Sequence, residues 1–261
     1  MTARTSLFDL TGKTALVTGG NGGIGLGFAT GMAKQGASIV LWGRNPEKNA
    51  AAEERLRAAG APRVESQVVD VGSEQAIRDG FAEAVATMGG RIDCVVSNAG
   101  HGGSYPLADM PTADWERMLA IHLNGGFFVV REAARHMRDR VEAGGPAGSI
   151  LICGSLSALG GGAGLAAYSS AKSGLLGLMR SAAAELAPLR IRVNMVAPGF
   201  IKTDITDDPA VIDLMTERSP MKRVGQTEDL EAIAAYLASD AASFHTGDVI
   251  TIDGGAMASL F

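Results

Sequence analysis

Short apolar segments alternate with longer helix-forming segments along the whole chain. Strands buried on both faces form continuous apolar runs, and parallel strands need helical crossovers between them. The pattern therefore predicts an α/β chain with a doubly wound parallel sheet of about seven strands and helices on both faces. The expected strands are Thr14–Thr18, Ser38–Trp42, Val64–Val69, Ile92–Ser97, Ser149–Cys153, Ile191–Ala197 and Val249–Ile252.

Helical periodicity and end signals mark the segments between these strands. Asn45, followed by Pro46 and Glu47, is a typical helix N-terminus. Thr112 and Thr227 each precede acidic residues and are expected to be polar caps. The expected helices are Ile24–Gln35, Pro46–Ala59, Glu74–Met88, Ala113–Val141, Tyr168–Leu186 and Glu228–Ala238.

One stretch breaks the alternation without dividing the chain. Residues 200–223 are polar, contain Pro209 and Pro220, and show little apolar periodicity. A loop of this length inside a compact domain is usually functional or mobile. We expect a single domain over residues 1–261 with a mobile substrate lid at about 200–223.

Composition excludes several classes of protein. Lys and Arg number 23 against 28 Asp and Glu, a net charge of −5, which argues against nucleic acid as a partner. Cys94 and Cys153 belong to no ligand cluster and suit a reducing compartment, and no metal site is expected. Met1–Leu10 has no signal-like apolar region, and no run of 18 apolar residues occurs. These features predict a cytoplasmic protein with no membrane partner.

A glycine-rich turn follows the first expected strand directly and opens a helix: Thr18-Gly19-Gly20-Asn21-Gly22-Gly23-Ile24-Gly25. Glycine permits positive φ and lets the backbone approach a diphosphate closely. The helix N-terminus offers unpaired N–H groups and partial positive charge. The turn therefore predicts a nucleotide-phosphate site formed by Thr18, Gly19, Asn21, Gly23, Ile24 and Gly25.

Three further side chains suggest a reaction. Tyr168 and Lys172 lie four residues apart, so they share one helix face, and Ser155 follows the strand Ser149–Cys153. Reducing a ketone by hydride transfer needs a positioned acid to protonate the oxygen. A neighbouring ammonium favours the phenolate form of tyrosine, and a serine hydroxyl can donate to the substrate oxygen. The set predicts Ser155, Tyr168 and Lys172 as catalytic residues.

Taken together, the TGxxxGxG spacing, Asn98-Ala99-Gly100 and the Ser155, Tyr168 and Lys172 set resemble the short-chain dehydrogenase/reductase family over almost the entire chain. The resemblance implies a Rossmann-type fold and an NAD(P)-dependent enzyme that interconverts a ketone and a secondary alcohol. It also implies that Asn124 holds a water that relays protons from Lys172. Further cofactor contacts implied are Asp70 and Val71 at the adenine, Asn98, Ala99 and Gly100 beside the turn, and Tyr168, Lys172, Pro198, Gly199, Ile201 and Thr203 at the nicotinamide half.

The end of the second expected strand bears on cofactor choice. Members of the family that prefer NAD place an acid there to bind the ribose 2′-hydroxyl. The corresponding position is Gly43, and the next residue is Arg44, whose planar guanidinium suits a 2′-phosphate. Asn21-Gly22 adds no second basic residue inside the turn. NADP(H) is favoured, and NAD(H) stays possible.

Substrate and assembly are less constrained. The start Leu7-Phe8-Asp9-Leu10-Thr11-Gly12-Lys13 resembles 3-oxoacyl-carrier-protein reductases and gluconate-type sugar-acid dehydrogenases. A carbonyl or 3-oxoacyl reductase is favoured; a sugar-acid or polyol dehydrogenase, a catalytically weak cofactor-sensing protein and a nucleotide-sugar epimerase are alternatives. The expected pocket comprises Ser157–Gly164, Gly102–Tyr105 and Phe200–Met215, with Lys202 and Asp204 as its charges. A homotetramer is expected through the helix after Tyr168, the helix near Thr112–Arg140 and the apolar segment Ala256–Phe261.

Overall fold

The computed structural model describes residues 7–259, and its centre is a seven-stranded parallel sheet of order β3-β2-β1-β4-β5-β6-β7. The strands are β1 (Thr14–Thr18), β2 (Ser38–Trp42), β3 (Val64–Gln67), β4 (Cys94–Ser97), β5 (Ser149–Cys153), β6 (Arg192–Pro198) and β7 (Val249–Ile252). The predicted doubly wound parallel sheet is confirmed. The strand order reverses between β1 and β4, and ligands of such sheets bind outside the carboxyl ends of the strands at this point.

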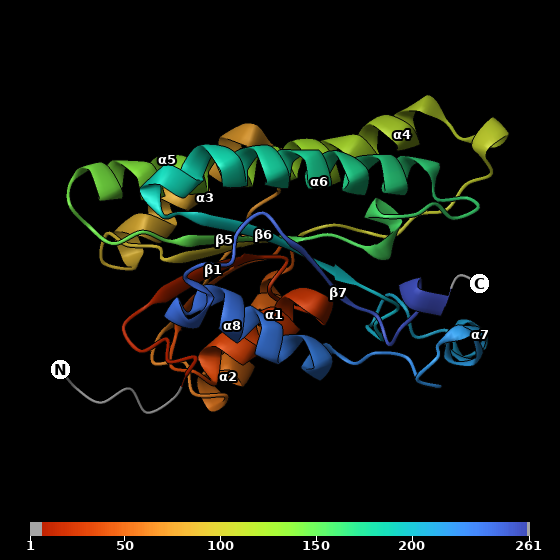
Figure 1. The fold of residues 1–261 in the computed structure, drawn as a ribbon, viewed down its shortest axis with the longest axis horizontal. Coiled ribbons are helices and arrows are strands. Elements are labelled where there is room, and N and C mark those ends of the chain that lie inside the picture. Colours follow the sequence, from red (N-terminus) through yellow and green to blue (C-terminus); the bar gives the residue numbers. More distant parts are fainter. Residues whose placement is uncertain (1–6, 260–261) are drawn as a thin grey trace.

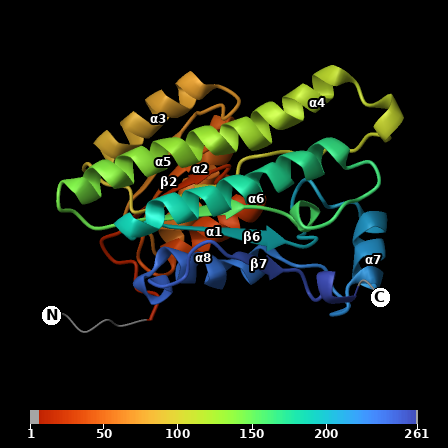
Figure 2. The ribbon, with the colours of Figure 1, turned by 45° about the horizontal axis from the view of Figure 1, so that its top comes forward.

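Helices cover both faces of the sheet (Figures 1 and 2). Helices α1 (Gly23–Ala33), α2 (Pro46–Ala58) and α8 (Glu231–Ala238) pack on one face, and α3 (Glu74–Thr87), α5 (Gly125–Glu142) and α6 (Ala166–Leu186) on the other. The protein has two hydrophobic cores, and alternate residues of β1 belong to each of them. Ala15 and Val17 are buried in one core, and Leu16 is buried in the other. This two-sided burial explains why the strands are continuous apolar runs.

Two predicted strands are too long at one end. The β2–β3 ladder stops at the pair Trp42–Gln67, so Val68 and Val69 lie outside it. Strand β4 begins at Cys94, and the backbone N–H of Ile92, two residues earlier, donates to His136 Nε2 (3.1 Å).

The single helix predicted over Ala113–Val141 is wrong. The segment consists of α4 (Thr112–Leu119), a π-helical turn at Ala120–Asn124 and then α5. The π turn inserts extra backbone and changes which side chains face the sheet. Thr112 is also not a cap, because Pro111 occupies the N-cap position and no side chain caps α4.

The segment 200–223 is not a plain loop, because it contains the helix α7 (Pro209–Arg218). Asp208 caps this helix by accepting the Ala210 N–H (2.9 Å), and Pro209 occupies its first turn. The Asp-Pro pair carries the same start signal as Asn45-Pro46, which caps α2 as predicted through the Lys48 N–H (2.8 Å).

The start of the last helical segment also differs from the prediction. Gln226, not Thr227, precedes the first turn, and Asp229 accepts the Gln226 N–H (2.8 Å). Short helical turns occupy Leu107–Asp109, Leu156–Ala158, Ala187–Leu189, Thr227–Leu230, Asp240–Ala242 and Met257–Ser259.

Parts of the two terminal segments lie outside the described residues. These are residues 1–6 of the N-terminal segment and residues 260–261 of the apolar C-terminal segment. Within residues 7–259, no helix combines the length and the apolar character needed to span a bilayer.

Candidate active site

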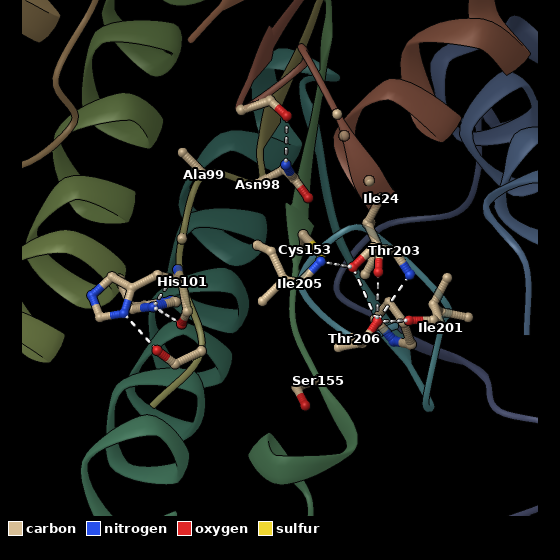
Figure 3. A pocket seen from close by; sticks show the side chains of 18 of the residues that line it. Ile24, Asn98, Ala99, His101, Cys153, Ser155, Ile201, Thr203, Ile205 and Thr206 are labelled. Atoms are coloured by element: carbon tan, nitrogen blue, oxygen red, sulfur yellow. Dashed lines mark hydrogen bonds between the residues drawn. The ribbon is translucent and has the colours of Figure 1, made fainter. Parts of the chain in front are cut away.

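A cavity of about 410 Å³ opens at the carboxyl ends of β1, β4, β5 and β6. Figure 3 shows the labelled side chains that surround it, from the start of α1, the ends of β4 and β5 and the segment after β6. A smaller hollow of about 140 Å³ shares Gly19, Asn21 and Ala99 with it and extends toward the end of β2. The two hollows lie at the reversal of strand order, where a dinucleotide is expected.

The start of α1 suits a diphosphate. Gly22 is the N-cap residue, and no side chain caps the helix, so its first N–H groups have no side-chain partner. A side chain at Gly22 would meet nothing within 4 Å, whereas one at Gly25 would overlap the Gly19 carbonyl. Gly19 and Gly23 adopt positive φ (63° and 50°). The backbone of the glycine turn therefore has no side chain on the side that faces the cavity and packs tightly against neighbouring backbone on the opposite side. This arrangement fits a bound phosphate group.

Thr18 lies behind the cavity wall rather than in it. It is 1% exposed, and its hydroxyl accepts the N–H groups of Asn98 and Ala99 (both 2.9 Å). Asn98 returns a bond from its Nδ2 to the Thr18 carbonyl (2.9 Å). These bonds join the glycine turn to Asn98-Ala99-Gly100, and the latter three residues line the cavity. Thr18 therefore shapes the wall without facing a ligand.

The end of β2 is crowded by two asparagines. A side chain at Gly43 would overlap Asn21 Nδ2 and Asn49 Oδ1, which bond to each other (2.7 Å). Asn49 is 2% exposed and also donates to the Gly43 carbonyl (3.1 Å). No acidic side chain fits at this position. Sequence reasoning missed Asn49 because it lies on α2, away from every motif.

The smaller hollow carries the residues expected at the adenine end. Asp70 and Val71 line it together with Arg44 and Gly43. Asp70 is exposed and accepts the Gly72 N–H (3.0 Å), which fixes its carboxylate at the rim. Arg44 is exposed at the same rim, so a guanidinium stands just after the carboxyl end of β2.

Ser155, Tyr168 and Lys172 line one wall of the main cavity. Lys172 is 4% exposed; its Nζ donates to the Cys153 carbonyl (2.8 Å) and lies 5.7 Å from the Tyr168 ring centroid. The Ser155 Oγ accepts the Ser157 N–H (3.1 Å), so the proton of this hydroxyl stays available to the cavity. The three predicted side chains are therefore brought together.

Asn124 is not brought into this cavity. It ends the π-helical turn, is exposed, and is absent from the cavity lining. The same turn directs His122 inward instead: this ring is 3% exposed and stands nearly perpendicular to that of Tyr168, with centroids 5.3 Å apart at 83°. The spacing along the sequence did not reveal that the inward-facing residue lies two positions earlier.

The other end of the cavity is only partly as predicted. Phe200 to Thr206, except Lys202, together with Gly102, Gly103 and Leu165, form the lining. Residues 157–164 do not line it, and Lys48 replaces Lys202 as a charge, paired with Asp204 across 3.4 Å. Pro198, Gly199, Ile201 and Thr203 line the cavity as expected.

Thr206 shapes the loop at this end and was missed in the sequence. Its hydroxyl donates to the Ile201 carbonyl (2.7 Å) and accepts the Thr203 N–H (2.9 Å). These two bonds close the chain on itself beside the cavity, as the dashed lines in Figure 3 show. The signal that could have revealed Thr206 is its position three residues after Thr203, since threonine hydroxyls often bond to nearby backbone.

No group of three or more His, Cys, Asp or Glu side chains within residues 7–259 is arranged to hold a metal ion. The absence of a metal role stays a prediction.

The protonation state of His122 leads to a testable dependence of the free energy of unfolding on pH. Burial, and after it the charge of Lys172 and the nearby His101, lowers the pKa of His122 from 6.5 to about 3. The unfolded chain binds a proton here below about pH 6.5 and the folded chain does not until about 3, so stability falls as pH drops through this window. At pH 5 the expected loss relative to pH 7 is about 2 kcal/mol.

Urea unfolding of the wild type and His122→Phe at pH 5 and pH 7 measures this loss. The variant should lose less stability between the two pH values than the wild type. An equal loss in both proteins would contradict the assignment of a neutral, buried imidazole.

Comparison with known proteins agrees with this geometry. A family model described as "Enoyl-(Acyl carrier protein) reductase" matches residues 19–257. The chain belongs to the short-chain dehydrogenase/reductase family. Its similarity to gluconate 5-dehydrogenase of Gluconobacter oxydans is 36% identity, covering 97% of this chain and 98% of the relative. A 3-oxoacyl-[acyl-carrier-protein] reductase of Aquifex aeolicus is 34% identical, covering 94% and 98%.

A solved structure of the family adds a ligand to the comparison. A candidate NAD(P)-dependent gluconate 5-dehydrogenase from Beutenbergia cavernae, with NADP bound at low occupancy, superposes with a TM-score of 0.88. It is 32% identical, covering 97% of this chain and all of that one. Membership in the short-chain dehydrogenase/reductase family makes this chain an NAD(P)-dependent oxidoreductase of alcohol and carbonyl groups, as the motifs predicted.

Proposed function

We propose that the protein reduces ketones to secondary alcohols with NADPH, with Tyr168 as the general acid. The observation that carries this proposal is the placement of Ser155, Tyr168 and Lys172 on one cavity wall, with Lys172 held by the Cys153 carbonyl (2.8 Å). The cavity continues into the bare helix start of α1, so one elongated ligand can reach both regions.

Each of the three side chains has a separate task. NADPH, when bound, supplies a hydride to the carbonyl carbon. Ser155 donates a hydrogen bond to the carbonyl oxygen and holds it where negative charge develops. The Tyr168 phenol gives that oxygen a proton, so the product leaves as a neutral alcohol. The Lys172 ammonium stabilises the resulting phenolate through its charge.

The cofactor contacts follow from the same cavity. We assign the diphosphate to Gly19, Asn21, Gly23, Ile24 and Gly25, the adenine to Asp70 and Val71, and the nicotinamide half to Pro198, Gly199, Ile201 and Thr203. Asn98, Ala99 and Gly100 form the floor between these regions, and Thr18 supports that floor through its hydrogen bonds. These residues line the two hollows, apart from Thr18.

Preference for NADPH rests on Arg44 and Gly43. Arg44 stands at the rim beside Asp70, and the asparagine pair at Gly43 leaves no room for an acid that would select NAD. Replacing Arg44 with alanine should lower kcat/KM for NADPH about 10–100-fold, the effect of one charge-assisted contact, and leave the value for NADH nearly unchanged.

Steady-state kinetics with both cofactors check this prediction. Arg63→Ala, on the surface before β3, is the control for loss of an exposed guanidinium. A wild type that favours NADH, or an Arg44 variant with unaltered preference, would refute the assignment.

Two substrate classes fit the cavity. Its lining is mostly glycine and apolar residues, including Phe200, Leu165 and Ile205, which suits a neutral ketone or a 3-oxoacyl group. An adjoining hollow of about 330 Å³ is lined by Tyr168 and by two cations and one acid, Arg44, Arg117 and Asp114. Such cations suit the carboxylate of an oxidised sugar acid. The similarity to a gluconate 5-dehydrogenase favours this second class.

A turnover panel decides between the classes. Oxidation of NADPH is followed with simple ketones, 3-oxoacyl thioesters and keto sugar acids at equal concentrations. A kcat/KM for neutral ketones or thioesters at least ~10-fold above that for keto acids supports the first class. Turnover restricted to keto acids supports the second. No turnover in any arm would refute a ketone reductase, because an epimerase or a cofactor-sensing protein consumes no NADPH.

We further propose that residues 200–223 act as a lid. Ile205, Leu214 and Met221 are large apolar side chains that are 72%, 42% and 62% exposed. Exposed apolar surface of this kind is expected on a segment that buries it on closing over a ligand. Binding of NADPH with a ketone analogue should slow amide hydrogen exchange in this segment at least several-fold. Exchange in α3 serves as the internal reference, and equal exchange with and without ligands would contradict the lid.

Assembly, domain extent and location are also proposals. The exposed Phe127 on α5 and the open space beside Gly177 on α6 support a homotetramer formed through these helices. Gly174, by contrast, packs against Leu123 of its own chain. The single sheet supports one domain over residues 1–261, and the two free, buried cysteines suit the cytoplasm.

A further inference from the structure

The glycine turn and the end of β2 meet at a pair of asparagines. Asn21 of the turn lines both hollows, and Asn49 lies on α2 and is 2% exposed. Asn21 Nδ2 donates to Asn49 Oδ1 across 2.7 Å. A side chain at Gly43 would overlap the amide groups of both asparagines. The pair therefore fills the space that a side chain at the end of β2 would take.

Backbone carbonyl groups fix the orientation of the Asn49 amide. Its Nδ2 donates to the carbonyl oxygens of Gly43 (3.1 Å) and Gln67 (3.4 Å), which can only accept. The opposite orientation would set the amide oxygen against these two oxygens, and burial removes water as an alternative partner. Asn49 therefore turns its nitrogen to the backbone and its oxygen to Asn21.

The orientation of Asn49 in turn fixes that of Asn21. Asn49 presents an acceptor, so Asn21 must present its Nδ2 to it, and Asn21 Oδ1 is the atom left over. Within residues 7–259, the hydrogen bond to Asn49 is the only one that the Asn21 amide forms, and Oδ1 accepts none. Asn21 is half-buried and lines both hollows, so this oxygen is an acceptor that a ligand can reach.

The end of β2 is the place where a dinucleotide-binding fold recognises the adenosine ribose. Folds of this kind that choose NAD put a carboxylate there to accept the 2′-hydroxyl. Gly43 has no side chain, but the Asn21 amide lies where that side chain would be and brings an acceptor from a different element. An amide oxygen carries no net charge, so it accepts a hydroxyl and repels a 2′-phosphate less than a carboxylate would.

We propose that Asn49 is a positioning residue for cofactor choice, which holds Asn21 Oδ1 as the acceptor for the adenosine 2′-hydroxyl of NADH. This inference rests on the proposed dinucleotide site of a ketone reductase. Arg44 at the same rim favours the 2′-phosphate of NADPH, and the Asn21–Asn49 pair keeps NADH as a second cofactor. The protein therefore binds both dinucleotides, NADPH more tightly.

The contact between Asn21 and the ribose is tested by equilibrium binding of NADH and of NADH that lacks the adenosine 2′-hydroxyl. The wild type should bind the deoxy form about 3–10-fold more weakly, the effect of one neutral hydrogen bond. Asn21→Ala should bind the two forms equally, because it has no acceptor for the hydroxyl. Fluorescence titration of the reduced nicotinamide gives each Kd without a ketone, so the result does not depend on turnover.

Substitution of Asn49 separates positioning from stability. Asn49→Leu keeps a branched side chain of similar size but releases the Asn21 amide, whose Nδ2 can then turn toward a 2′-phosphate. The ratio of the Kd for NADH to the Kd for NADPH should rise about 3–10-fold, whereas lost stability alone would weaken both cofactors alike. Adding Asn49→Leu to Asn21→Ala should leave the ratio of that variant unchanged, because both residues act through one contact.

Asn194→Leu is the matched control for a buried asparagine. Asn194 is also 2% exposed and bonds to backbone, since it donates to the His245 carbonyl (2.7 Å) and accepts the Asp248 N–H (3.1 Å). It lines neither hollow. The substitution should lower the midpoint of thermal unfolding and leave the ratio of the two Kd values unchanged.

Four binding results would overturn the proposal about Asn49. They are equal wild-type affinity for NADH and its deoxy form, no wild-type binding of NADH beside binding of NADPH, an unchanged Kd ratio in Asn49→Leu, and a ratio in the double variant that differs from that of Asn21→Ala. Asn49→Ala, which adds no bulk, takes the place of Asn49→Leu if the latter does not fold. A wild type that binds neither dinucleotide shows instead that the proposed function itself has failed.

Discussion

Replacing Tyr168 with phenylalanine is expected to lower kcat by at least ~10³-fold while the Kd for NADPH stays within a few-fold. The substitution removes one oxygen atom and keeps the ring that packs against His122. Only the proton donor is lost, so binding and fold should persist. Single-turnover reduction of a ketone, with NADPH binding measured separately, distinguishes these two quantities.

Tyr236→Phe is the matched control for this experiment. The Tyr236 hydroxyl lies 3.1 Å from His245 Nδ1, and neither residue lines the cavity. Removing it should affect stability and leave kcat unchanged. Turnover by Tyr168→Phe at the wild-type rate would remove the basis for the proposed acid.

Replacing Lys172 with methionine should damage both catalysis and cofactor binding. The expected losses are about 10²-fold or more in kcat and about 10–100-fold in NADPH affinity, since the ammonium both stabilises the phenolate and, by the family resemblance, contacts the nicotinamide ribose. Kinetics and equilibrium binding on the same preparation give both values. An unchanged affinity would exclude the ribose contact.

The free energy of unfolding of Lys172→Met must be measured together with its kinetics and its affinity for NADPH. Methionine leaves the Cys153 carbonyl without the Nζ donor. An unsatisfied buried carbonyl costs about 1–3 kcal/mol if nothing replaces that bond. Lys34→Met is the control, because Lys34 forms an exposed pair with Glu231 on the protein surface. A loss of kcat in both variants would point to general destabilisation instead of a specific role.

The sheet could be predicted because its signals are local. A strand buried on both faces shows itself in five consecutive residues, as β1 and β5 do, and Asn45-Pro46 marks a helix start within two. The glycine turn, Ser155, Tyr168 and Lys172 were recognisable for the same reason, since fixed spacings put them at neighbouring strand and helix ends.

The inward-facing residue near Tyr168 could not be read from spacing. A regular helix over Ala113–Val141 gives no reason to prefer His122 to Asn124, and the family resemblance pointed to asparagine. The π-helical turn at Ala120–Asn124 decides the matter, because it rotates the side chains relative to the sheet. The residue types at Ala120–Asn124 do not predict a π-helical turn there.

Packing between segments distant in sequence explains the other features of the site that could not be predicted from the sequence. Gly43 is glycine because Asn21 and Asn49 meet there, a contact across 28 residues of chain. Thr18 faces the backbone of Asn98 and Ala99 rather than the cavity. Such contacts depend on tertiary structure, which short-range patterns do not encode. Helix α7, by contrast, had a recognisable start at Asp208-Pro209 that the polar character of the stretch obscured.

The central claim is that this cavity brings a hydride from NADPH to a carbonyl carbon. Its most direct test uses NADPH deuterated at the transferred position of the nicotinamide, the ketone from the panel with the highest kcat/KM, and mass spectrometry of the product. The expected product with the wild-type protein is an alcohol that carries one deuterium on the carbinol carbon, and Tyr168→Phe should form almost none of it in the same time. An unlabelled alcohol, or equal amounts of labelled alcohol from both proteins, would contradict the claim.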